Sequence, residues 1–217
     1  MIPPEIWRLD RLQVLNLGGL GLTGPLSTEI GNLSRLFALN LSGNALSGVI
    51  PPTIGELTNL ISLSLSDNVF EGPIPAEILN ITDLASLDLA GNRLAGEIPA
   101  GLGELANLQS LDLRRNRLTG ELPPSLGGLE LLHELRVADN DLTGELPPEF
   151  GGPSGDRTDR PGGQCHVARR PALGLGRKEP YVGRDRCGHG VVCSPARGCS
   201  GLATHERPHV HSGLCRG

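Results

Sequence analysis

A repeat of 24 residues constrains the fold of this chain more than any other feature of its sequence. Rows that begin at residue 9 and advance by 24 align six times without an insertion or a deletion. Their first residues are Leu9, Leu33, Leu57, Ile81, Leu105 and Leu129. A unit of this length cannot bury its apolar side alone, so such a chain stacks one unit on the next.

Within each row, apolar residues recur at offsets 0, 3, 6 and 8. In the second row these residues are Leu33, Leu36, Leu39 and Leu41. The last two are spaced by two, which predicts a short strand with one buried face. The composition agrees with a core of repeated leucines and isoleucines joined by tight turns, because the chain has 31 Gly and 18 Pro but only 2% aromatic residues.

Asparagine occupies offset 11 in five of the six rows. These residues are Asn44, Asn68, Asn92, Asn116 and Asn140, whereas the first row has Leu20. An amide side chain both donates and accepts hydrogen bonds, so a stacked column of asparagines can satisfy the backbone groups where each strand turns away. We therefore predict a structural asparagine ladder.

A Leu-x-Gly-x-Ile-Pro segment, with Leu replacing Ile in some rows, follows the asparagine in successive rows, as in residues 94–99. Glycine allows a backbone conformation that a Cβ would hinder, and proline fixes φ and removes a donor. We expect the chain to bend here along the outer side of each coil.

The whole pattern resembles the plant-type leucine-rich-repeat family, including the ectodomains of plant receptor-like kinases and polygalacturonase-inhibiting proteins. The resemblance covers residues 2–152, in which residues 2–8 match the closing third of a preceding repeat. It implies an α/β solenoid, a right-handed superhelix with a concave parallel sheet and an irregular or 3₁₀ convex side.

The charge changes sign after residue 152. Residues 1–152 contain 8 Arg and 19 acidic residues, a net charge of −11, whereas residues 153–217 have a net charge of +6. We expect residues 1–152 to form the solenoid, and residues 153–217 to be a basic Gly/Arg/Cys/His-rich tail that is either disordered or translated out of frame. The alternative is a small metal or disulfide module built on Cys187, Cys193, Cys199, His205 and His209, although the cysteine gaps do not match common zinc spacing.

Compartment is not encoded directly. No run of about 18 apolar residues could span a bilayer, and the first residues do not read as a secretory signal. The sequence also begins inside a repeat, which favours a truncated chain. The family resemblance favours an extracellular or cell-surface location.

Residues beside the strand leucines are predicted to line the concave side. The central column is Asn16, Asn40, Ser64, Asp88, Asp112 and Arg136, and we place Gln13, Phe37, Ile61, Ala85, Gln109 and His133 next to it. The candidate ligand-binding residues are Phe37, Ile61, Asp88, Asp112, Arg114 and Arg136. An exposed apolar pair beside a bipolar strip suits a protein partner, and ordinary surface variation is the alternative. Arg114–Arg117 could hold an acidic or sulfated group, or simply compensate nearby acids.

Three glycosylation sequons begin at Asn32, Asn40 and Asn80. A glycan on Asn40 would cover part of the concave side near Phe37. The repeat consensus also generates Asn-Leu-Ser triplets by itself, so the sequons indicate secretion only weakly.

The one match to a nucleotide-binding motif in the repeats is accidental. Gly19–Gly24 matches G-x-G-x-x-G, but Gly24 belongs to the repeat and no long helix follows. We therefore predict a non-catalytic recognition module with a protein or peptide ligand, a glycan being a further option, and without a nucleic acid, a cofactor or a metal. The alternative is an intracellular scaffold or a truncated gene product without an independent role.

Overall fold

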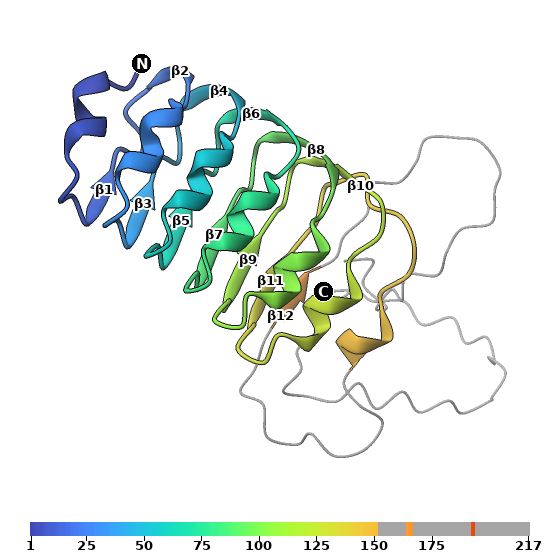
Figure 1. Ribbon diagram of the computed structural model, residues 1–217. Helices are drawn as coiled ribbons and strands as arrows, with labels where there is room; N and C mark the ends of the chain where they lie inside the picture. The colour runs from blue at the N-terminus through green and yellow to red at the C-terminus, as the bar shows by residue number, and fades with distance from the viewer. Residues whose placement is uncertain (152–163, 167–191, 194–217) are drawn as a thin grey trace, which may run out of the picture.

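The computed structural model describes residues 1–151, 164–166 and 192–193, and shows residues 1–151 as a solenoid of stacked coils (Figure 1). Each coil contains a short strand, a second strand or extended segment, and a 3₁₀ helix. This arrangement confirms the predicted leucine-rich solenoid, with one strand of the first sheet in each row.

The first strands of the coils lie side by side in a parallel sheet, which we call the concave sheet. Residues at equal offsets face each other, for example Leu15, Leu39 and Leu63. The six strands from the repeats are β1 (Val14–Asn16), β3 (Ala38–Asn40), β5 (Ser62–Ser64), β7 (Ser86–Asp88), β9 (Ser110–Asp112) and β11 (Glu134–Arg136). The strict 24-residue period keeps the same residue type in register from strand to strand.

Two further strands of this sheet come from the predicted tail. β12 (Gln164–His166) pairs parallel with β11, and β13 (Val192–Cys193) pairs antiparallel with β12. The rest of residues 153–217, including Cys187, Cys199, His205 and His209, lies outside the described residues. The disordered, out-of-frame and metal-module interpretations remain predictions there.

A second parallel sheet forms where the sequence predicted only a bend. Its strands are β2 (Thr23–Pro25), β4 (Ala45–Val49), β6 (Val69–Gly72), β8 (Arg93–Glu97) and β10 (Arg117–Thr119). Paired residues are 22 apart, as in Thr23 and Ala45, rather than 24. The chain does turn at the repeat glycines, whose φ values run from +77° at Gly48 to +88° at Gly96. The bend and the sheet coexist because the glycines themselves lie within or at the end of the strands and pair with the neighbouring coil, as Gly24 does with Leu46 and Gly48 with Phe70.

The convex side consists of 3₁₀ helices, as the family resemblance implies. They are η1 (Pro4–Arg8), η2 (Thr28–Asn32), η3 (Pro52–Glu56), η4 (Ala76–Asn80), η5 (Ala100–Glu104), η6 (Pro124–Gly128) and η7 (Pro148–Gly151). Proline is the N-cap residue of η3 to η6, because its extended backbone leads directly into the turn. Ser27 takes this place in η2, and its hydroxyl accepts a hydrogen bond from the Glu29 amide. The helices approach closely, since a Cβ on Gly55 would clash with the carbonyl oxygen of Glu77.

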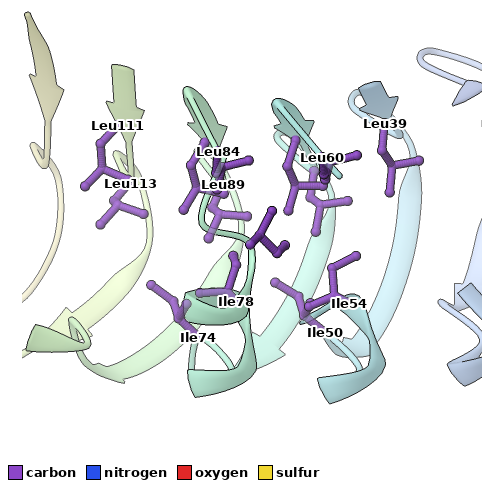
Figure 2. Packing of buried hydrophobic residues seen from close by; sticks show 14 of the residues in the cluster. Leu39, Ile50, Ile54, Leu60, Ile74, Ile78, Leu84, Leu89, Leu111 and Leu113 are labelled. Atoms are coloured by element: carbon purple, nitrogen blue, oxygen red, sulfur yellow. The ribbon is translucent and has the colours of Figure 1, made fainter. Parts of the chain in front are cut away.

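The core lies between the concave sheet and the 3₁₀ helices (Figure 2). Leu39, Leu84 and Leu89 belong to the sheet side, and Ile54 and Ile78 face them from the helix side. Burial depends on neighbouring coils, because the first residue of the first row, Leu9, is 50% exposed whereas Leu33 is fully buried. None of the helices in the described residues is long and apolar enough to cross a membrane.

Candidate functional site

The outward side chains of the concave sheet form the candidate site, which we call the concave face. In each strand the buried leucine lies between two outward residues, because successive side chains point to opposite sides. The first outward column is Val14, Ala38, Ser62, Ser86, Ser110 and Glu134, and the second is Asn16, Asn40, Ser64, Asp88, Asp112 and Arg136. The second column agrees with the prediction. The residues of the predicted neighbouring column, from Gln13 to His133, directly precede the strands and lie at the edge of this face.

Two exposed apolar residues lie at the edge of the concave face. Phe37 is 40% exposed and Ile61 is 48% exposed. The Ile61 amide donates to the Phe37 carbonyl at 2.9 Å, so the two residues are neighbours in adjacent coils. Beside them lie Ala38 and Ser62, whose small side chains leave the apolar pair accessible.

The two arginines of the concave face are held by its own acids. Arg114 Nη2 lies 2.7 Å from Asp112 Oδ2, and Arg114 Nε donates to Asp112 Oδ1 at 3.0 Å. Arg136 contacts the Glu134 carboxylate and lies 3.5 Å from Asp112 Oδ2. The hydrogen bonds that Arg114 donates to the Asp112 carboxylate raise the pKa of Arg114, so its guanidinium stays charged. These side chains neutralise one another rather than standing free.

Asp112 corrects one expectation about the site. Only 6% of this residue is exposed, because Arg114 and Arg136 cover its carboxylate. It therefore does not offer a free carboxylate to a ligand. Its part in the site is to orient the two arginines, which the sequence could not show because Arg136 is 24 residues away.

Asp88 is the acid of the concave face with the weakest compensation. The Ser64 hydroxyl donates to Asp88 Oδ2 at 3.2 Å, and the Ala90 amide donates to Oδ1 at 3.2 Å. The three ion pairs in the described part of the chain all involve Asp112 or Glu134. Asp88 is half-buried, and none of the described arginines lies within ion-pair distance of its carboxylate.

The arginine run 114–117 does not form one anion site. Arg114 lies on the concave face and is paired with Asp112, whereas Asn116 is buried and Arg117 begins β10 in the second sheet. Arg115 lies in the intervening turn with a φ of +54°. The structure thus separates these guanidinium groups onto different sides of the coil.

The turn after each concave strand carries a signal that sequence reasoning missed. Asp67, Arg115 and Asp139 have positive φ values, and Gly19, Gly43 and Gly91 occupy the same offset in the other coils. The alternation of Gly and Asp there could have indicated a left-handed turn, because these residues tolerate it best.

The asparagines at offset 11 connect neighbouring coils through hydrogen bonds. Asn92 Nδ2 donates to the Leu65 carbonyl of the preceding coil at 3.0 Å and to the Leu89 carbonyl of its own coil at 3.1 Å. Its Oδ1 accepts from the Phe70 amide at 3.0 Å. Asn44, Asn68, Asn116 and Asn140 repeat this arrangement. In the first coil, which has no such asparagine, the Leu20 amide donates to Asn44 Oδ1 at 3.1 Å.

The three sequon asparagines have different surroundings. Asn32 and Asn80 are exposed at the ends of η2 and η4. Asn40 is half-buried on the concave face, and its Oδ1 accepts a 2.7 Å hydrogen bond from Ser42 Oγ of the same sequon. Among the described residues, no three His, Cys, Asp or Glu side chains are grouped as metal ligands.

Family models match a large part of the solenoid. The leucine rich repeat model matches residues 82–142, and a second leucine rich repeat model matches residues 35–57 and 59–81. A comparison with curated proteins found no match.

Solved structures similar to this chain come from plants. The Arabidopsis receptor kinase HAESA, in complex with the peptide hormone IDA and the co-receptor SERK1, is 38% identical over 70% of this chain, with a TM-score of 0.68. This chain spans only 26% of the length of that receptor chain. The BIR3–SERK2 complex from Arabidopsis thaliana is 33% identical over 64% of this chain and 73% of that chain, with a TM-score of 0.57.

A plant ice-binding protein is also similar, with 39% identity over 60% of this chain and 42% of that chain, and a TM-score of 0.58. These neighbours have different roles on one fold. The choice of ligand therefore depends on the surface residues of each chain.

Proposed function

The chain belongs to the leucine-rich-repeat family, and on that premise we propose that its concave face binds an extended peptide or a protein segment without catalysing a reaction. The observation that carries this proposal is the apolar pair Phe37 and Ile61 beside a strip of small outward side chains. Adjacent exposed apolar side chains mark sites of protein interaction, and a few buried anchor residues supply most of the binding energy of an interface. The small residues between the strands leave room for a backbone to approach the sheet.

Similarity to receptors supports this proposal. HAESA is solved with a peptide hormone and a co-receptor, and this chain shares its repeat over 70% of the chain. We propose an extracellular or cell-surface location on the same ground. A glycan ligand is a second chemistry that the polar strip of Ser62, Ser64 and Ser86 could accept.

A peptide selection tests the proposal. A library of random dodecapeptides displayed on phage would be selected against the full chain, and the enriched peptides measured for binding to three proteins. These are the wild type, Ser86→Arg on the concave face, and Thr119→Arg on the second sheet. Because Ser86 is half-buried in the first outward column of the concave face, its replacement by a long charged side chain obstructs that face.

We expect enriched peptides to bind the wild type and the Thr119→Arg variant equally, and to lose at least tenfold in affinity for Ser86→Arg, as a binding-surface obstruction predicts. Failure to enrich any peptide would contradict the proposal. Equal binding to all three proteins would contradict the assignment to the concave face.

The alternative proposal is a scaffold or a truncated gene product without an independent role. We place the end of the solenoid at residue 152, where the charge changes sign and the repeat stops. Sequencing the transcript around the Gly152 codon decides whether residues 153–217 are a genuine tail or an out-of-frame translation. A second reading frame that restores leucine at position 153 and continues the 24-residue rows would show that residues 153–217 are an artefact.

A further inference from the structure

The charges of the concave face do not balance. Its strands and the residues next to them carry three acids, Asp88, Asp112 and Glu134, against two arginines, Arg114 and Arg136. Both arginines are already paired with acids. Asp88 feels the charge of Arg114 only at a distance, because the hydrogen bonds of that guanidinium go to Asp112, and the direct contacts of the Asp88 carboxylate are a serine hydroxyl and a backbone amide.

Asp88 lies within reach of the apolar pair. Ser64 faces Asp88 in the register of β5 and β7, and Ile61 precedes Ser64 by three residues. The strand rise and spacing place Ile61 and Asp88 about 11 Å apart, the length of about three extended residues. Ser62 and Ser86 between them carry small side chains, so an extended ligand can span both positions.

The charges of the concave face disfavour an anionic ligand. An acidic or sulfated group placed near Arg114 or Arg136 would have to displace Asp112 or Glu134, which already hold these guanidinium groups. Residues 1–152 as a whole have a net charge of −11, which attracts cations at long range. Charge complementarity thus favours a positively charged ligand.

We propose that the ligand of this face, if the peptide-binding role above is correct, is an extended cationic segment. Its Lys or Arg side chain contacts the Asp88 carboxylate, and an apolar side chain two or four residues away, on the same side of the extended segment, covers Phe37 and Ile61. The basic group replaces the arginine that Asp88 lacks. The apolar group supplies the buried surface that makes the contact specific.

Two synthetic peptides test this inference on the ¹⁵N-labelled full chain by NMR titration. One is Gly-Ser-Leu-Ser-Lys-Ser-Lys-Ser-Gly, whose lysines point to the same side as the leucine when the peptide is extended, and the other has both lysines replaced by glutamate. The variants are Asp88→Asn and Glu97→Gln. Asn keeps one acceptor oxygen for the Ala90 amide, and its Nδ2 can donate to the Ser64 hydroxyl oxygen, so the variant is expected to fold. Glu97 is exposed on β8 of the second sheet, so its replacement removes the same charge far from the face.

We expect the lysine peptide to shift the amides of Ala38, Ser62 and Asp88 and to bind more tightly than the glutamate peptide. Asp88→Asn should weaken the lysine peptide roughly two- to fivefold, the range of a partly exposed ion pair, whereas Glu97→Gln should not. Added salt should reduce the difference between the peptides.

Equal or tighter binding of the glutamate peptide at the same amides would overturn the charge assignment and leave the peptide-binding proposal standing. Equal weakening by Asp88→Asn and Glu97→Gln would also overturn it, since only net charge would then matter. If neither peptide moves these amides, the inference is wrong, and the display selection decides separately whether the concave face binds peptides at all.

Discussion

Phe70 and Phe37 are the same residue type in adjacent coils, yet they have opposite surroundings. Phe70 occupies a leucine position of the repeat and is fully buried, whereas Phe37 precedes a concave strand and is 40% exposed. The asparagines differ in the same way, since Asn92 is 8% exposed in the ladder and Asn16 is exposed on the concave face. The offset within the coil, rather than the residue type, decides whether a side chain is buried in the core or exposed on the surface.

The largest expected effect comes from the two phenylalanines. Phe70→Ala should lower the free energy of unfolding by about 3–5 kcal/mol, because it leaves a cavity in a packed coil. Phe37→Ala should lower it by less than about 1 kcal/mol, since the ring is partly in water already. Urea unfolding followed by circular dichroism measures both. Similar losses for the two variants would contradict the division between interior and face.

The asparagines should show the next largest difference. Asn92→Ala removes two donors and one acceptor from buried backbone groups of two coils, and we expect a loss of about 2–3 kcal/mol. Asn16→Ala should cost less than about 0.5 kcal/mol, because water replaces its contact with the Gly18 amide. The same unfolding measurement applies. Equal losses of unfolding free energy for Asn92→Ala and Asn16→Ala would show that the ladder does not stabilise the fold.

Two glycines sharpen the role of the turn. Gly96 has a φ of +88°, and its replacement by alanine should cost about 1–2 kcal/mol through backbone strain. Gly128 has no such φ, and a Cβ there would meet nothing within 4 Å. Gly128→Ala is therefore the matched control and should leave the unfolding free energy unchanged or slightly raised. An equal cost at both sites would show that strain is not the cause.

Glycan occupancy should have the smallest effect on stability and still distinguish the two regions. In a secreting eukaryotic host, we expect glycans on Asn32 and Asn80, which are exposed away from the concave strands. Asn40 should stay unmodified, because its side chain is half-buried and bonded to Ser42. Mass spectrometry after enzymatic deglycosylation reports occupancy site by site. Full occupancy of Asn40 would show that the concave face near Phe37 is covered.

The 24-residue period alone determined the stack of coils, the strand in each coil, the positions of the buried leucines and the asparagine ladder. These features depend on contacts between equal offsets in successive rows, so one row predicts the next. The backbone geometry at Pro51 and Gly48 is likewise predictable from the sequence, since the proline ring and the lack of a Cβ in glycine act locally.

The tertiary structure decided what the concave face offers to a ligand. The sequence shows Asp88 and Asp112 at the same offset, but only the structure shows that two arginines cover Asp112 and none contacts Asp88. The second sheet and the separation of Arg114 from Arg117 also appear only in three dimensions. The physical reason is that compensation of a charge depends on which side chains lie within reach in the same coil, as for Arg114 and Asp112, and in the next coil, as for Arg136 and Asp112, and these residues differ from row to row and follow no period.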